Sequence, residues 1–138
     1  MEIKGKAIVL TNGVYTTKSA KTAHGLVRGS SRFDILGIID NKFYDNDAGK
    51  LLDGKHRNIP IYKSLLSFLN LSINIDYCII GVASAGGVLP EEMRSDIILS
   101  LKNNISIVNG LHSFLEDDLE ISEIAKINNT KLYDIRKP

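Results

Sequence analysis

The stretch DYCIIGVA, residues 76–83, decides the fold class, because an apolar run this continuous is typical of a strand that is buried on both faces of a sheet. Similar short apolar runs recur along the chain and predict further strands at 7–10, 33–40, 59–62, 105–110 and 130–135. Helical patterns separate these runs. A regular alternation of strands and helices predicts an α/β protein with a mainly parallel sheet of about five to six strands.

The helical patterns lie at 19–28, 62–69, 89–104 and 116–129. The third begins with Pro90 and two glutamates, which is a common way for a helix to start. Right-handed crossovers between parallel strands then give a three-layer, Rossmann-like fold. We expect residues 1–138 to form a single domain of this kind. The stretch 41–58 exceeds the usual connection length and is predicted to be an irregular functional loop.

Composition indicates an ordinary globular protein. Hydrophobic residues make up 43% of the chain and charged residues 24%, and 17 Lys plus Arg nearly balance 16 Asp plus Glu. This balance gives no general reason to expect a nucleic acid or a membrane as partner. The first apolar run, 7–10, is too short for a signal peptide or a membrane span, so a cytoplasmic location is expected. The single cysteine, Cys78, lies in apolar surroundings and is expected to be a buried, inert thiol.

In an open parallel sheet, ligands bind beyond the carboxyl ends of the strands, near the point where the strand order reverses. The loop after the first predicted strand supplies candidate cofactor-binding residues: Asn12, Gly13, Thr16, Thr17, Lys18 and Ser19. It is neither a dinucleotide loop nor a P-loop, because the other glycines are missing and Lys18 comes one position too early. Amides at a helix start, hydroxyls and a lysine still favour an anion. Alternatively, Thr17 or Ser19 only caps the helix and Lys18 is solvated.

Two further candidates follow the second predicted strand. Asp40 ends that strand, where nucleotide-binding folds place an acid for ribose hydroxyls, and an acid in a strand-end turn explains it equally well. Arg57, within DGKHRN at residues 53–58, is a candidate for binding a carboxylate or a phosphate. A charged loop residue of this kind is also often only solvated.

The ends of the fourth and fifth predicted strands complete the candidate site. Ser84, Gly86 and Gly87 can form a concave nest of amide donors for a phosphate or an oxyanion, or the glycines can simply permit a tight turn. Asn109 and His112 are candidates for substrate binding, and a hydrogen-bonded structural histidine is the alternative for His112. No metal is predicted, because the three histidines of the chain show no ligand spacing.

Several segments together resemble a known family. They are KGKAIVLTNGVYTTKSAKTAHGLVRGS (4–30), DGKHRNIPIY (53–62), GVASAGGVLPEE (81–92), SIVNGLHSFL (106–115) and YDIRKP (133–138). This set is similar to the N-terminal Rossmann-like domain of a family long catalogued only as a domain of unknown function, whose members include D-glutamate N-acetyltransferases that use acetyl-CoA. The likeness extends over essentially the whole chain.

The resemblance implies a function and partners. Members of the family are usually longer, with a C-terminal P-loop domain after the segment that ends near YDIRKP, and the sequence here stops at Pro138. The expected partners are that P-loop domain, in the same chain or as a separate one, and a small amino-acid substrate, with acetyl-CoA as co-substrate. A weaker likeness of layout, to the CoA-binding domain of succinyl-CoA synthetase-type ligases, agrees with acetyl-CoA.

Two hypotheses follow from the resemblance. In the first, the chain is the substrate- or cofactor-binding domain of a D-glutamate N-acetyltransferase-like enzyme. Residues 16–19 then hold phosphate, Gly86 and Gly87 offer amides, and Arg57 or His112 meets the amino-acid carboxylate. No catalytic base is identified. In the second, it is a noncatalytic module that binds a nucleotide or CoA, or docks on a P-loop domain or another subunit, and a homo-oligomer is possible. A hydride-transferring oxidoreductase comes third, because the glycine pattern is absent.

Overall fold

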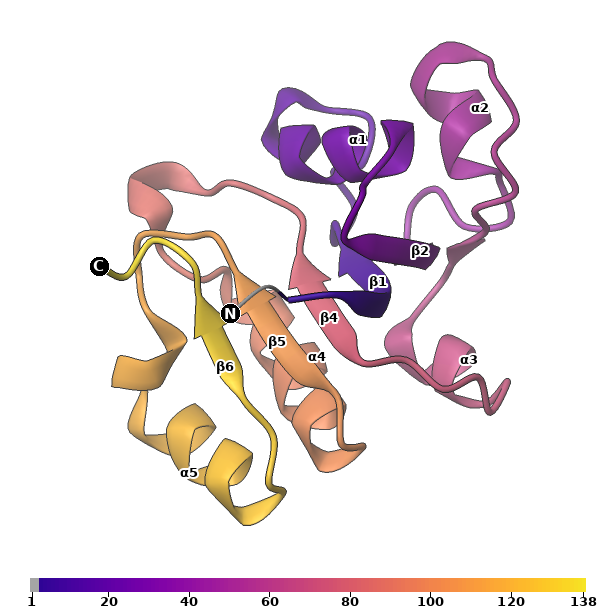
Figure 1. Cartoon of the computed structure of the whole chain (residues 1–138). Coiled ribbons are helices and arrows are strands. Elements are labelled where there is room, and N and C mark those ends of the chain that lie inside the picture. The colour runs from indigo at the N-terminus through magenta and orange to yellow at the C-terminus, as the bar shows by residue number, and fades with distance from the viewer. Residues whose placement is uncertain (1–2) are drawn as a thin grey trace.

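The sheet of the computed structural model, which describes residues 3–138, has six parallel strands in the order β3-β2-β1-β4-β5-β6 (Figure 1). The strands are β1 (Gly5–Leu10), β2 (Phe33–Ile39), β3 (Ile61–Tyr62), β4 (Tyr77–Ile80), β5 (Ser106–Asn109) and β6 (Leu132–Asp134). Each coincides with a predicted strand. The predicted α/β fold with a parallel sheet is therefore confirmed.

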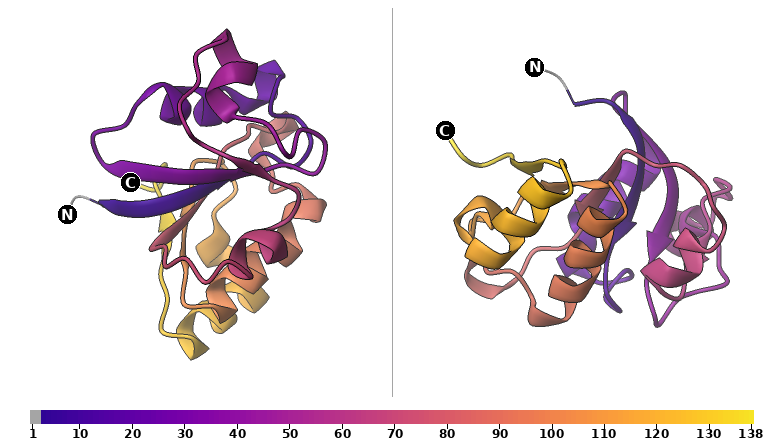
Figure 2. Two further views of the ribbon diagram at one scale, coloured as in Figure 1. Left: turned by 90° about the vertical axis from the view of Figure 1, so that its right-hand side faces the viewer. Right: turned by 90° about the horizontal axis from the view of Figure 1, so that it is seen from below.

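Helices cover both faces of this sheet. They are α1 (Lys21–Arg28), α2 (Ala48–Asp53), α3 (Leu65–Leu69), α4 (Glu91–Lys102) and α5 (Leu119–Ile127), with 3₁₀ turns at Lys18–Ala20, Ala85–Gly87 and Leu115–Asp117. Figure 2 shows α1 and α2 on one face, and α3, α4 and α5 on the other. This arrangement is the predicted three-layer, Rossmann-like architecture.

The prediction of an irregular loop over 41–58 is wrong, because this segment contains α2. The Asp47 carboxylate caps the helix by accepting from the Lys50 amide at 3.0 Å, and Gly54 ends it in the left-handed conformation with φ of 84°. The same carboxylate also accepts from the Ile59 amide at 2.8 Å, which folds the end of the segment back onto its start. The helix is too short to show a periodic apolar pattern in the sequence.

The strand predicted over 76–83 ends at Ile80, because the chain beyond it bonds to α1. The Gly81 carbonyl accepts from the Ala23 amide at 3.2 Å, and the Ala83 amide donates to the Ser19 carbonyl at 2.8 Å. These two bonds attach the start of α1 to the end of β4. The loop after the first strand is thereby fixed against the loop after the fourth.

The core lies where the apolar runs predict it. In β1 the side chains from Ala7 to Leu10 are at most 1% exposed, as expected for a strand covered on both faces. Cys78 on β4 is fully buried, and burial raises the pKa of its thiol to about 12, so the thiol stays protonated and unreactive at neutral pH. Within the described residues, the helices are too short or too polar to cross a membrane.

Gly81, the residue after β4, packs closely against β1 and against Ala23 of α1. A methyl group there would lie 2.3 Å from a Val9 methyl carbon and 3.1 Å from the Leu10 carbonyl oxygen. We predict that Gly81→Ala lowers the free energy of unfolding by about 2 kcal/mol through overpacking. Urea unfolding followed by circular dichroism measures this change.

Gly25 on the outer side of α1 provides the matched control. A methyl group there would meet no atom within 4 Å, and we expect Gly25→Ala to raise the free energy of unfolding by about 0.5 kcal/mol through a better helix propensity. Equal stability of the two variants would contradict the close packing of Gly81 against β1 and α1.

Candidate functional site

The loops after β1, β4 and β5 meet at one edge of the sheet, because the carboxyl ends of parallel strands share that edge. The chain runs from β1 toward β3 on one side and from β4 toward β6 on the other, so the strand order reverses between β1 and β4. This is the edge at which open α/β sheets bind ligands. The predicted site residues are therefore described from this reversal outward.

The loop after β1 is organised around the carboxylate of Asp40. Its Oδ2 accepts from the Thr11 hydroxyl at 2.6 Å, the Gly13 amide at 3.0 Å and the Tyr15 amide at 3.1 Å. Its Oδ1 accepts from the amides of Lys42 and Phe43 at 2.9 and 3.1 Å. Asp40 is fully buried. Both oxygens are thus engaged within the chain, as in the strand-end alternative for this residue.

This geometry explains why the loop needs no glycine fingerprint. In phosphate-binding loops, successive backbone amides converge on a phosphate. Here the amides of Gly13 and Tyr15 converge on Asp40 instead. Gly13 has φ of 89°, and Asn12, with φ of 49°, also adopts the left-handed conformation that turns the chain around the carboxylate. These two amides are therefore already bonded to a carboxylate of the chain itself.

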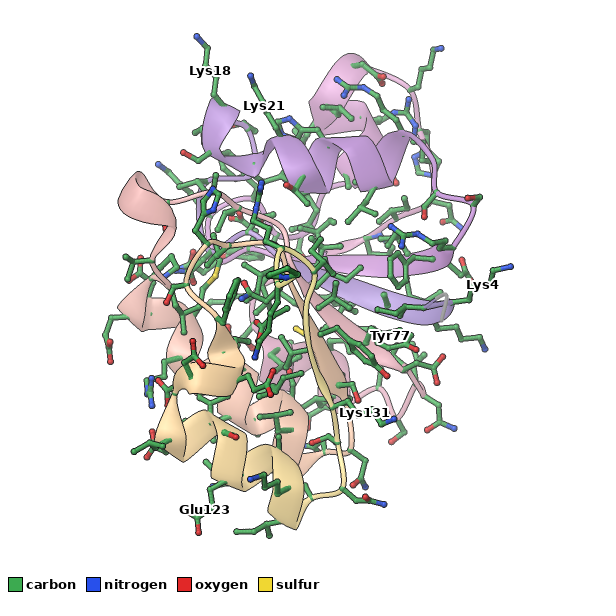
Figure 3. The ribbon with its side chains drawn as sticks, turned by 60° about the vertical axis from the view of Figure 1, so that its left-hand side comes forward. Lys4, Lys18, Lys21, Tyr77, Glu123 and Lys131 are labelled. Atoms are coloured by element: carbon green, nitrogen blue, oxygen red, sulfur yellow. The ribbon has the colours of Figure 1, made fainter. Side chains whose placement is uncertain are left out.

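The residues that follow form and cap the 3₁₀ turn Lys18–Ala20, which leads into α1. The Thr17 hydroxyl accepts from the Ser19 amide at 3.2 Å and donates to the Val14 carbonyl at 2.8 Å. Thr16, Lys18 and Ser19 are exposed. Figure 3 shows Lys18 extending away from the sheet into solvent. Thr17 is therefore a cap, and phosphate binding by this loop stays a prediction.

A cavity of about 210 Å³ lies beyond the carboxyl ends of β4 and β5. The lining includes three of the predicted site residues, Ser84, Gly87 and His112, together with Arg136, which the sequence analysis missed. The Nε of Arg136 donates to the Gly110 carbonyl, so the guanidinium is held at the rim. The full lining is Thr22, Ile80, Val82, Ala83, Ser84, Gly87, Gly110, Leu111, His112 and Arg136.

A larger hollow of about 750 Å³ lies at the opposite edge, near the amino ends of β1, β2 and β4, where it is lined by residues that include Gly5, Arg32 and Asp76. Parallel sheets of this kind bind ligands at the carboxyl edge. The smaller cavity also brings predicted site residues together, whereas the larger hollow contains none of them among its described lining residues. We therefore take the smaller cavity as the candidate site.

Gly87 places His112 at this cavity. Its φ is 68°, and a methyl group on it would lie 2.7 Å from the His112 Cβ, so only a glycine allows the two loops to approach this closely. The Gly87 amide donates to the Ser84 carbonyl at 2.9 Å, and the Gly87 carbonyl accepts from the Ser113 amide at 2.9 Å. The Ser84 hydroxyl donates to the Val88 carbonyl. The Gly87 amide is thus already hydrogen-bonded within the turn, whereas Gly86 is exposed.

Asn109 holds the loop that carries His112. Its side-chain amide donates to the Ser113 carbonyl and to the Asp134 carboxylate, both at 2.9 Å, and its Oδ1 accepts from the Leu111 amide at 3.1 Å. Asn109 is fully buried. Its polar atoms therefore position the loop. Asp134 is the last residue of β6, and Asp40 directly follows β2. This repeated acid at a strand end was the signal in the sequence that could have identified Asp134.

Arg57 lies apart from these residues, on the segment around α2. Its guanidinium donates to both oxygens of Asp53 at 2.7 and 2.8 Å, and this contact holds the pKa of the Asp53 carboxyl well below its usual range. Arg57 lies outside the described lining of the cavity. Within residues 3–138, no three His, Cys, Asp or Glu side chains are grouped so that they could hold a metal ion.

We predict that Asp40→Asn lowers the free energy of unfolding by about 3 kcal/mol, because the amide group turns donors toward amides that need an acceptor. Chemical unfolding measures the change. Asp34→Asn is the matched control, since Asp34 is exposed on the same strand, and we expect a change within about 0.5 kcal/mol. An Asp40→Asn protein as stable as the Asp34→Asn control would show that the buried carboxylate does not organise the loops.

Comparison with known proteins places this architecture in a family. Residues 41–138 match the family described as a domain of unknown function (DUF1611_N), a Rossmann-like domain. A D-glutamate N-acetyltransferase of Tritonibacter scottomollicae is 30% identical over 60 residues, which are 44% of this chain and 18% of that protein.

Solved structures agree with this match. A DUF1611 family protein from Anabaena variabilis ATCC 29413 superposes with a TM-score of 0.84 at 25% identity, over 97% of this chain and 38% of that one. An S. aureus homoserine dehydrogenase, with a TM-score of 0.55 at 12% identity over 97% of this chain and 32% of its own, shares the fold alone. This chain thus spans well under half of the proteins to which it is similar. It belongs to the DUF1611_N family of Rossmann-like domains.

Proposed function

We propose that this chain is the substrate- or cofactor-binding domain of a D-glutamate N-acetyltransferase-like enzyme, which transfers acetyl from acetyl-CoA to an amino acid and works with a C-terminal P-loop domain. The observation that carries the proposal is the cavity at the carboxyl edge, which has an arginine and a histidine in its lining, in a chain related to a D-glutamate N-acetyltransferase. Either a continuous chain or a separate one supplies the P-loop domain.

The size of the cavity favours the amino acid as its occupant. Sites for drug-sized ligands measure roughly 300–1,000 Å³, and this cavity of about 210 Å³ suits a smaller molecule. A guanidinium such as that of Arg136 binds a carboxylate through two parallel hydrogen bonds. D-glutamate offers such carboxylates, so Arg136 takes the role that the sequence analysis gave to Arg57 or His112.

The chemistry requires a neutral amine and a proton acceptor. The amine nitrogen attacks the thioester carbonyl carbon, the C–S bond breaks, CoA leaves as the thiolate, and a base takes the proton from the amine. His112 carries the imidazole in the described lining of the cavity, and imidazole is the side-chain group that most often serves as a general base. It therefore meets the substrate amine in this proposal.

The acyl donor is too large for the cavity and lies across the adjacent loop. Between Glu2 and Asp34 the sequence has no acid. Lys18 and Lys21 lie at the carboxyl edge, where α1 begins, whereas Lys6 and Arg32 line the hollow at the amino edge. The two lysines at the carboxyl edge attract the phosphates of CoA. The exposed Thr16, Lys18 and Ser19 are the groups that reach them.

A noncatalytic module is the second candidate, and one observation favours it. Three of the predicted site groups form hydrogen bonds with partners in the chain itself: Asp40, Asn109 and the Gly87 amide. They therefore do not act on a substrate. A module of this kind binds its ligand, or docks on a P-loop domain or another subunit, without turnover.

Calorimetric titration with D-glutamate tests the role of Arg136. We predict that Arg136→Gln weakens binding of D-glutamate about tenfold, because one charge-assisted pair is lost. Lys137→Gln is the matched control, since Lys137 donates to Glu116 at 2.8 Å and lies outside the described lining of the cavity. Equal affinities of the two variants for D-glutamate would contradict the proposal that this cavity binds the amino acid.

Acetyl transfer separates the two candidate functions. We expect this chain alone to bind acetyl-CoA in preference to NAD and to release no free thiol with D-glutamate. Mixed with the C-terminal part of a longer family member, it should release thiol, and His112→Ala should abolish that release while acetyl-CoA still binds. Binding without turnover in the mixture would support the noncatalytic module, and the absence of binding to any of these ligands would contradict both.

A further inference from the structure

The segment from Ser64 to Ile75 forms α3 and the loop after it, and it has no charged residue, although charged residues make up 24% of the chain. Leu65 and Phe68 are fully buried and attach it to the core. Figure 1 shows α3 at one flank of the molecule and α5 at the opposite flank. The segment is therefore anchored on its inner side and open on its outer side.

Large apolar side chains are exposed on this outer side. Leu66 on α3 is 57% exposed, and Leu71 and Ile73 in the loop are 50% and 41% exposed. The exposed polar residues of the segment are all uncharged: Ser67, Asn70, Ser72 and Asn74. Protein interfaces have the same composition at their centres, where charged residues are depleted. We call the segment 64–75 the α3 patch.

We infer that the α3 patch joins two copies of this chain in a twofold symmetric dimer, with the two segments antiparallel. A twofold interface brings a surface against its own copy, so like charges near the axis would repel. The α3 patch avoids that repulsion because it contains no charged residue. This proposal goes beyond the ligand site and does not depend on it.

The charges at the two ends of the α3 patch favour a second copy over another partner. Lys63 precedes the patch and Asp76 follows it, and both are exposed. An antiparallel twofold arrangement brings Lys63 of one copy toward Asp76 of the other at each end. The patch is therefore complementary to itself in apolar character and in charge. The midpoint of the segment, near Asn70, lies close to the twofold axis.

Sedimentation equilibrium over a wide range of concentrations tests the dimer. We expect a reversible dimer whose dissociation constant rises about tenfold or more in Leu71→Lys, because a central apolar contact becomes a repelling charge pair. Leu119→Lys is the matched control, since Leu119 is 86% exposed on α5. A monomer at all concentrations, or equal effects of both substitutions, would overturn the inference. Circular dichroism confirms that both variants remain folded.

Disulfide trapping gives an independent test of the antiparallel geometry. Cys78 is buried and does not interfere. Asn70→Cys should form a covalent dimer under mild oxidation, because the two positions face each other near the axis. Leu119→Cys should stay monomeric under the same conditions. Covalent dimers that form equally in both variants, or only in Leu119→Cys, would overturn the arrangement.

Discussion

The buried carboxylate of Asp40 is the interaction on which the carboxyl edge of this sheet depends. It accepts five hydrogen bonds, three from the loop after β1 and two from its own turn, so it joins the connections of two neighbouring strands. A buried charge is costly unless such donors surround it. The bent path of the chain from Thr11 to Tyr15 is the shape that delivers them. That path in turn sets where α1 begins.

This loop also bonds to α2 on one side and to the loop after β4 on the other. The Tyr15 hydroxyl donates to the Ala48 carbonyl at 2.7 Å, which connects the loop to the first turn of α2. Burial raises the pKa of Tyr15 to about 12, so the hydroxyl remains a donor. On the other side, the Ser19 carbonyl accepts from Ala83. This bond joins the loops after β1 and β4, and the cavity lies mainly between the loops after β4 and β5.

The sequence predicts the sheet well because each strand is an apolar run buried on both faces, and burial of this kind depends on local composition. It predicts α2 poorly because that helix is too short for a periodic pattern and depends on a cap by Asp47. The residues of the candidate site also differ in how far local sequence reveals them. Strand ends are visible in the sequence, so the candidates chosen there include Ser84, Gly87 and His112, which line one cavity. Hydrogen-bond partners far along the chain, such as those of Asp40 and Asn109, are not visible.

Arg136 shows why the remaining part of the site escaped prediction. It stands two residues after β6, in the segment YDIRKP, where nothing marks it as a ligand-binding residue. It reaches the cavity because β6 pairs with β5 at the edge of the sheet. Position in a parallel sheet therefore brings a terminal residue to the same edge as loops far from it in sequence. The α3 patch lies on the β3 side of the sheet, whereas this cavity lies toward β5 and β6. Two copies joined through α3 would consequently leave both cavities open to ligand.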